Sequence, residues 1–355
     1  MENTDIVTNI VDDVVDSEAL PEKKDYILEV DGLKQHFPIS KDFFGRPLAF
    51  LKAVDGVSFK LERGKTLGVV GESGCGKTTL GRTILRLYDV TEGSAKYTSL
   101  DKNGNKITHD LATISKKDFY KLRTELQLVF QDPYSSLPPR MTVGAIISEA
   151  VRVHKLVPEE QINEYVRGVM ARCGLQPHHF DRYPHEFSGG QRQRICIARA
   201  LAVKPKLVIC DEPVSALDVS IQAQIINLLK KLQREEGMSY MFISHDLSVV
   251  KYISDDIAVM YLGNIVEMGS AKEICTNPKH PYTQALFSAV PVANPHAKSE
   301  PVALEGELPS PANPPKGCKF HTRCKYCMEK CRDEAPETVD VGGGHYVACH
   351  LAKEQ

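Results

Sequence analysis

The chain contains no tryptophan, no apolar run of the ~20 residues that a membrane-spanning helix needs, and no excess charge of either sign. Its 355 residues include 44 Lys and Arg against 46 Asp and Glu, a net charge of -2. This balance gives no indication of a nucleic-acid-binding surface. Residues 1–25 are acidic and have no charged-then-apolar leader, so we expect a solvated tail there and no secretory signal. A secreted, membrane-spanning or disordered protein is not expected, and the expected compartment is the cytosol.

Short apolar runs alternate with amphipathic stretches over most of the remaining sequence. Strands are expected at 27–37, 53–61, 67–70, 207–210 and 240–244, and helices at 77–88, 191–203 and 221–236. Strands that alternate with helices predict a parallel sheet covered by helices. Amphipathic stretches at 143–154 and 159–173 predict a helical insertion at about 120–187. The proline-rich segment 277–315 is expected to be a linker or an extended arm.

A glycine-rich segment matches the pattern G-x-x-x-x-G-K-[ST] between an expected strand and an expected helix. Chance gives roughly 0.01 such matches in a chain of this length. Glycines let successive backbone N–H groups point at phosphate oxygens, while Lys77 can reach the β- and γ-phosphates and Thr78 can ligate Mg²⁺. The predicted nucleotide-binding residues of this phosphate loop are Gly71, Ser73, Gly74, Cys75, Gly76, Lys77, Thr78 and Thr79. Since Cys75 lies at a helix start, its thiol pKa is expected to fall; a small residue that the loop merely tolerates is an equal alternative.

An acidic pair, Asp211-Glu212, follows the apolar run 207–210. Parallel strands present their carboxyl ends to ligands, so Asp211 is expected to hold Mg²⁺ through water and Glu212 to polarise an attacking water as general base. Alone, such a pair could equally be a helix cap or a solvated pair. Its position after a phosphate loop favours the functional interpretation.

A third motif, Ser188-Gly189-Gly190-Gln191, precedes an expected helix. Ser188 is expected to cap that helix and to leave the N–H groups of its first turn available for an anion. The motif resembles the signature of ATP-binding-cassette (ABC) proteins, with Phe187 where leucine is commonest. Other residues resemble further motifs of that family and occur in the same order. Gln131 resembles the Q-loop glutamine, Ser215 to Asp218 resemble the D-loop, and His245 resembles the switch histidine. Phe37 resembles the aromatic residue that stacks on adenine.

The resemblance implies an α/β fold. Residues 26–270 would form a P-loop ABC ATPase domain, which has a mixed-sheet core and a helical subdomain. It implies Glu212, His245 and Lys77 as catalytic residues, and Mg²⁺ held through Thr78, Gln131 and Asp211. In this family two domains pack head to tail, and each ATP lies between the phosphate loop of one and the signature of the other. Ser215 and Asp218 are therefore expected at the dimer interface.

Two further stretches resemble one subfamily. Segment 277–286, continuing to 290–291, resembles the C-terminal extension of peptide and nickel importer ATPases, and 34–50 resembles the first loop of the F-type member of the paired dipeptide/oligopeptide subunits. This implies ATP hydrolysis that powers peptide import from the cytoplasmic side of the inner membrane. The implied partners are a paralogous ATPase, two permease subunits and an extracytoplasmic binding protein. The alternatives are a nickel or other small-solute importer, or a soluble ABC-type switch without a permease.

Five of the ten cysteines lie in the last 38 residues, within an expected extension at 271–355. Four thiolates there could hold zinc or an iron–sulfur cluster, and the spacing alone does not choose between them. Reduced thiols without a metal are a third possibility. The segments around Cys318, Cys324, Cys331 and Cys349 match the C-terminal motif of the importer subfamily, which implies that these four residues ligate a [4Fe–4S] cluster. The motif does not require Cys327, which could be a free thiol or replace a neighbouring ligand.

Overall fold

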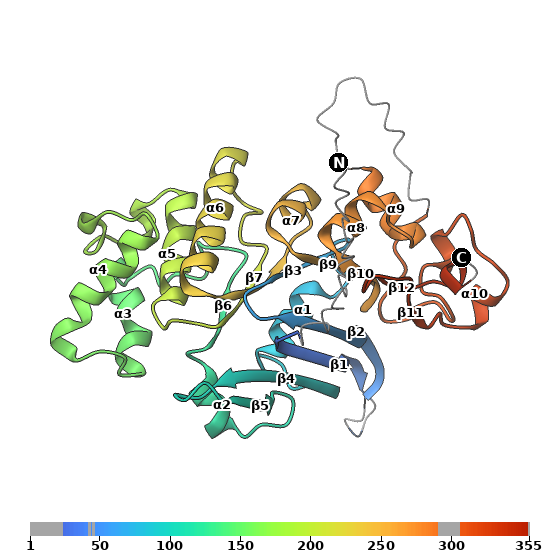
Figure 1. Cartoon of the computed structure of the whole chain (residues 1–355), viewed down its shortest axis with the longest axis horizontal. Helices are drawn as coiled ribbons and strands as arrows, with labels where there is room; N and C mark the ends of the chain where they lie inside the picture. The colour runs from blue at the N-terminus through green and yellow to red at the C-terminus, as the bar shows by residue number, and fades with distance from the viewer. Residues whose placement is uncertain (1–23, 42–43, 45–46, 290–305, 354–355) are drawn as a thin grey trace, which may run out of the picture.

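The computed structural model describes residues 24–41, 44, 47–289 and 306–353 (Figure 1). Most of the expected acidic tail lies outside the described residues. Asp25, the last residue of that expected tail, is paired with Arg63 at 3.0 Å and with Lys106 at 2.8 Å. No helix among the described residues is long and apolar enough to cross a membrane. The division into three parts at residues 25 and 270 stays a prediction.

An eight-stranded mixed sheet forms the centre of the molecule, in the order β11-β12-β10-β9-β3-β8-β7-β6. Its parallel strands are β3 (Thr66–Val70), β6 (Leu126–Val129), β7 (Leu207–Asp211), β8 (Ser239–Ile243) and β9 (Asp256–Tyr261). The antiparallel strands are β10 (Asn264–Ser270), β11 (Thr338–Asp340) and β12 (Tyr346–Ala348). Every residue of β3, β7 and β8 is buried, which accounts for their continuous apolar sequences. The expected mixed sheet is confirmed.

A second, four-stranded antiparallel sheet packs on the opposite side of α1 (Figure 1). Its strands are β1 (Tyr26–Lys41), β2 (Pro47–Glu62), β4 (Glu92–Leu100) and β5 (Lys106–Asp110). Helix α1 (Lys77–Ile84) lies between the two sheets, and α2 (Lys116–Leu122) follows β5. Both strands extend beyond the expected ranges 27–37 and 53–61, because β1 and β2 stay paired as far as Lys41 and Pro47.

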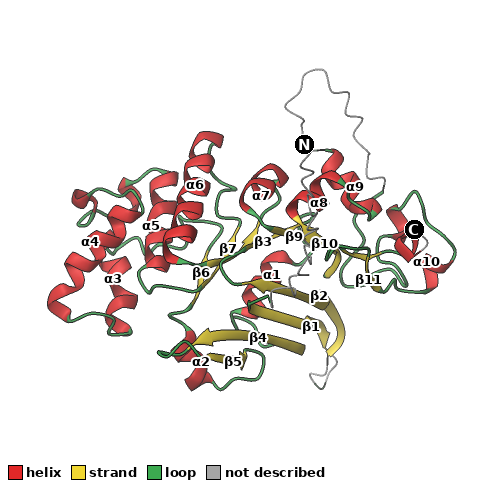
Figure 2. Ribbon diagram, in the orientation of Figure 1, coloured by secondary structure: helices red, strands yellow, loops and turns green. Residues whose placement is uncertain are grey.

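Helices gather at one end of the large sheet and along one of its faces (Figure 2). They are α3 (Val143–Val153), α4 (Ile162–Arg172), α5 (Gly189–Leu201), α6 (Val219–Glu236) and α7 (Leu247–Ile253). The two amphipathic stretches of the expected insertion correspond to α3 and α4, whose apolar faces pack with α5 in one core. Gly237 ends α6 with φ 65°, directly after the end expected at residue 236, because glycine adopts this left-handed conformation readily.

The C-terminal part is joined to the large sheet, because β12 pairs with β10 from Glu267↔Val347 to Met268↔Tyr346. Its helices are α8 (Ala271–Thr276), α9 (Pro281–Ser288) and α10 (Lys330–Asp333). Short 3-10 turns occur here and in the helical region at Glu159–Gln161, Pro177–His179, Pro184–Glu186, His321–Arg323 and His350–Lys353. The expectation of a linker at 277–315 is wrong for α9, since Tyr282 and other residues of that helix are buried.

Candidate active site

The phosphate loop connects β3 to α1 at the centre of the large sheet. Gly71 has φ +149°, and a Cβ there would lie 2.2 Å from the Met260 carbonyl oxygen. Gly76, the residue before α1, has φ +108°, and a Cβ there would lie 2.0 Å from the Ala53 carbonyl oxygen. Both positions therefore require glycine for space as well as for backbone conformation.

Lys77 begins α1 and is buried. Its Nζ donates hydrogen bonds to the carbonyl oxygens of Gly71 at 2.8 Å and Glu72 at 3.0 Å. The ammonium group therefore lies across the phosphate loop and is held by backbone oxygens of that loop. A phosphate in the loop would provide a charged partner for the same group.

Thr78 and Asp211 meet where α1 faces the carboxyl end of β7. Thr78 Oγ1 donates a hydrogen bond of 2.6 Å to Asp211 Oδ1, and the Arg82 guanidinium lies 3.5 Å from Asp211 Oδ2. Burial raises the pKa of Asp211, although Thr78 and Arg82 act in the opposite direction. The contact brings together two of the residues that the sequence assigned to Mg²⁺, and that role stays a prediction.

Glu212 lies at the next position, where the chain leaves β7. Its Oε2 accepts a hydrogen bond of 2.9 Å from Gln131 Nε2 and lies 3.1 Å from His245 Nδ1. The backbone at Glu212 has φ 47°, a conformation that costs energy for a residue with a side chain and that recurs at functional sites. Three residues that the sequence assigned to separate motifs are thus in contact.

Most of these groups line one hollow of about 530 Å³. Its lining residues are Leu51, Ala53, Ser73, Gly74, Gly76, Lys77, Thr78, Thr79, Gln131, Glu212, His245 and Pro311. Sequence reasoning missed Leu51, Ala53 and Pro311, which are apolar and carry no motif. Phe37, expected to stack on adenine, packs edge-on against Tyr88 at 5.1 Å and is not among the lining residues. Its adenine role stays a prediction.

The Ser188 motif caps α5 as expected. The Ser188 hydroxyl accepts the Gln191 N–H at 3.4 Å, and the Gln191 side chain accepts the Ser188 N–H at 3.1 Å. Ser188 and Gly189 are exposed, whereas Gly190 is buried, where a Cβ would lie 2.4 Å from Ile221. None of these residues lines the hollow of the same chain. Ser215 is half-buried and Asp218 is exposed, at the N-terminus of α6.

The Cys75 side chain differs from expectation. Its exposed fraction is 1%, and it is not among the residues that line the hollow. Burial raises the pKa of the Cys75 thiol, and the opposing charge of Lys77 does not compensate. The expectation of a lowered pKa is therefore wrong, because it considered the helix start and not the desolvation of the sulfur.

Two family models match the chain: "ABC transporter" over residues 54–215 and "Oligopeptide/dipeptide transporter, C-terminal region" over residues 266–331. The chain is 52% identical to the oligopeptide transport ATP-binding protein AppF of Bacillus subtilis, over 92% of this chain and 97% of that protein. It is 51% identical to the dipeptide transport ATP-binding protein DppF of Escherichia coli, over 91% and 93%.

The chain belongs to the family of ABC transporter ATP-binding proteins. The solved structure of cbiO1 from Clostridium perfringens, part of an ABC transporter complex, matches 72% of this chain and 92% of its own, with 29% identity and a TM-score of 0.58. The predicted family and the ABC ATPase fold are thereby confirmed. This ABC protein is an ATPase with the C-terminal region of the peptide transporter subfamily.

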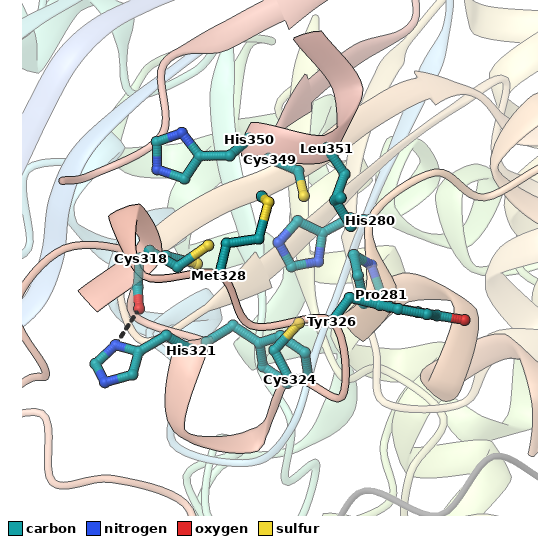
Figure 3. Close-up of a pocket in the computed structure, with 12 residues that line it drawn as sticks. His280, Pro281, Cys318, His321, Cys324, Tyr326, Met328, Cys349, His350 and Leu351 are labelled. Atoms are coloured by element: carbon teal, nitrogen blue, oxygen red, sulfur yellow. Dashed lines mark hydrogen bonds between the residues drawn. The ribbon is translucent and has the colours of Figure 1, made fainter. Parts of the chain in front are cut away.

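A second, small hollow of about 10 Å³ lies in the C-terminal region of this ABC protein. Figure 3 shows the sulfur atoms of Cys318, Cys324 and Cys349 directed toward one space beside His280. Cys331 also lines this hollow, whereas Cys327 does not, and its Sγ contacts the Met328 carbonyl oxygen at 3.5 Å. Among the described residues, no group of three or more His, Cys, Asp or Glu is arranged to hold a single metal ion. The metal-binding role of the cysteines is not confirmed and stays a prediction.

Proposed function

We propose that this ABC ATPase powers the import of dipeptides or oligopeptides, with each ATP bound between the phosphate loop of one subunit and the Ser188 motif of another. The observation that carries the proposal is the single hollow around which Lys77, Thr78, Gln131, Glu212 and His245 converge. The peptide substrate class is supported by the C-terminal match and by the names of the relatives at about 50% identity.

Each site residue has a different proposed role in ATP hydrolysis. Lys77 would exchange its two carbonyl partners for phosphate oxygens. Glu212 would accept a proton from the attacking water, while Gln131 and His245 hold its carboxylate in place. The Ser188 hydroxyl and the first turn of α5 would contact the γ-phosphate from the opposite subunit, because they are exposed and carry the positive end of a helix.

A magnesium ion fits the residues beside the phosphate loop. Thr78 and Asp211 bring a hydroxyl and a carboxylate oxygen to within 2.6 Å of each other, and oxygen is the ligand that Mg²⁺ prefers. Gln131, which lines the same hollow as Thr78, would add an amide oxygen. When bound, the ion would neutralise charge on the β- and γ-phosphates. Asp211, Thr78 and Gln131 are the residues that would hold it.

Transport needs partners that this chain does not contain. We propose a paralogous ATPase subunit, two permease subunits contacted through the helical region α3–α5, and an extracytoplasmic binding protein. The chain would act at the cytoplasmic side of the inner membrane as a peripheral subunit. A nickel or other small-solute importer, and a switch protein without a permease, are the alternatives.

Reconstituting the complex in lipid vesicles tests the proposal. We expect hydrolysis to be stimulated by peptide-loaded binding protein. Labelled peptide supplied outside with the binding protein should accumulate in the lumen when the ATPase subunits face the lumen and ATP is enclosed there. Lys77→Ala should abolish both. Peptide-independent hydrolysis at full rate by the isolated chain would instead support the switch, and stimulation by nickel-loaded binding protein would support the nickel alternative.

We also propose that Cys318, Cys324, Cys331 and Cys349 hold a [4Fe–4S] cluster. One zinc ion needs its thiolates at about 2.3 Å from a single atom, whereas each thiolate of such a cluster binds a different iron, so the four sulfurs need to surround a space and not a point. Four cysteines line one small hollow, and no group among the described residues is arranged around a single ion, which favours the second arrangement. The cluster would crosslink the C-terminal region; we assign it no redox step.

A further inference from the structure

The C-terminal region forms hydrogen bonds and an ion pair with the phosphate loop at Glu72. Arg323 Nη1 and Nη2 donate hydrogen bonds to Glu72 Oε2 at 2.7 Å and Oε1 at 3.1 Å, a two-point ion pair. Tyr282 from α9 accepts the backbone N–H of Glu72 through its hydroxyl at 2.9 Å. The third polar group of Glu72, its carbonyl, accepts the Lys77 ammonium. Two of the three polar groups of this loop residue are therefore held from outside the ATPase core.

Both side chains that hold Glu72 are themselves fixed by packing. The Arg323 side chain is only 6% exposed, against 27% for Glu72, and its guanidinium lies 5.9 Å from the centre of the Tyr261 ring. Tyr261 packs against Tyr282 at 4.8 Å and against Phe320 at 5.3 Å. An aromatic cluster thus sets the positions of both contacts, and neither depends on a mobile surface side chain.

The Arg323–Glu72 ion pair also changes the electrostatic environment of the phosphate loop. Glu72 places a carboxylate in the loop that receives an anionic polyphosphate, and two like charges held close together repel. The Arg323 guanidinium is permanently charged and is buried against that carboxylate, so it cancels this repulsion. Another ion pair between the C-terminal region and the ATPase core, Lys319–Asp55 at 2.9 Å, touches no residue of the phosphate loop.

We propose that Arg323 and Tyr282 are positioning residues of the ATP site: Arg323 neutralises Glu72, and Tyr282 fixes the backbone at the start of the phosphate loop. The C-terminal region thereby sets the affinity of the site for nucleotide. This inference rests on the proposed ATP-binding role of the phosphate loop. It does not require that the cysteines hold a metal.

Nucleotide affinity of the full-length chain tests the proposal, with a fluorescent ATP analogue displaced by MgATP or MgADP. Arg323→Gln should raise the dissociation constant for MgATP about tenfold, less for MgADP, and less at high salt, because an uncompensated carboxylate repels phosphate charge. Glu72→Gln should bind at least as tightly as the native chain. The double variant should bind like Glu72→Gln. Tyr282→Phe, which keeps the ring, should weaken binding about threefold.

Lys319→Gln is the matched control, since it breaks the other ion pair and should lower the unfolding temperature without changing the MgATP constant. If Arg323→Gln and Glu72→Gln weaken binding equally, or if the double variant adds the two losses, the pair only docks the C-terminal region and the proposal is wrong. If Arg323→Gln binds MgATP with native affinity, the proposal is wrong as well. If Lys77→Ala also binds MgATP like the native chain, the phosphate loop is not the nucleotide site and the proposed function fails as well.

Discussion

Gln131 and Glu212 are joined by a hydrogen bond of 2.9 Å, although 81 positions separate them in the sequence. Gln131 follows β6 and Glu212 follows β7, and these strands are parallel neighbours from Leu126↔Leu207 to Val129↔Cys210. The register of the edge strand β6 against its neighbour β7 therefore brings the amide to the carboxylate. The contact also connects the start of the helical region to the carboxylate proposed as general base.

Replacement of Glu212 by Gln tests the general base. The amide keeps the size and the hydrogen-bonding distance of the side chain but does not accept a proton, so ATP should bind with near-native affinity while turnover falls about 100-fold or more. Single-turnover hydrolysis by the assembled complex, measured with the MgATP dissociation constant, separates the two effects. Native turnover in this variant would show that another group activates the water.

The Ser188→Ala variant tests whether Ser188 only caps α5 or also contacts ATP across the subunit interface. Loss of the capping hydroxyl should lower the free energy of unfolding by about 1 kcal/mol. Thr142 is a matched control, because its hydroxyl caps α3 through the Ala145 N–H and lies outside the proposed interface. Both alanine variants should lose similar stability in denaturant titrations, but only Ser188→Ala should lose ATP-dependent pairing of ATPase subunits in sedimentation. Equal pairing in the two variants would contradict the assignment.

Local sequence pattern was sufficient for the parts of the fold whose cause is local. The apolar run 207–210, the glycine at 237 and the serine at 188 each specify a strand, a helix end or a helix start through their own neighbours, and all three occur as expected. The phosphate loop was predictable for the same reason. Its glycines are required by close backbone contacts that any strand–loop–helix unit of this type makes.

Contacts between distant segments were not predictable in this way. Arg323 meets Glu72 across 251 positions, and nothing in the residues near either one indicates the other. Helix α9 was missed because the prolines of segment 277–315 suggested an extended arm, whereas the burial of α9 depends on Tyr261 and Phe320 from other segments. The prediction of a lowered Cys75 pKa was wrong for a similar reason. The desolvation of the sulfur depends on the residues packed around it, and only the fold determines these.

Cys75 should react slowly with alkylating reagents although it lies in the phosphate loop. Burial raises its thiol pKa, so the thiolate fraction at pH 7 is smaller than that of a free cysteine and increases only at higher pH. The comparison is with Cys275: burial raises its thiol pKa as well, but its side chain is partly exposed, so the reagent can reach it. Mass spectrometry of iodoacetamide-treated native chain should show Cys275 modified well before Cys75 across pH 7 to 9, with no protection that depends on MgATP. Rapid modification of Cys75 that MgATP prevents would restore the original expectation.

Cysteine variants distinguish the proposed cluster from zinc and from free thiols. Cys318→Ser removes one of the four sulfurs that line the C-terminal hollow, so anaerobically purified protein should lose its brown colour, its iron and its acid-labile sulfide. Cys327→Ser is the control: its sulfur contacts the Met328 carbonyl and does not line the hollow, so this variant should keep iron and sulfide at native amounts. Visible absorption with iron, sulfide and zinc analysis gives the measurement. Colourless native protein that contains zinc, or no metal, would contradict the cluster, and loss of iron in Cys327→Ser would change the ligand set.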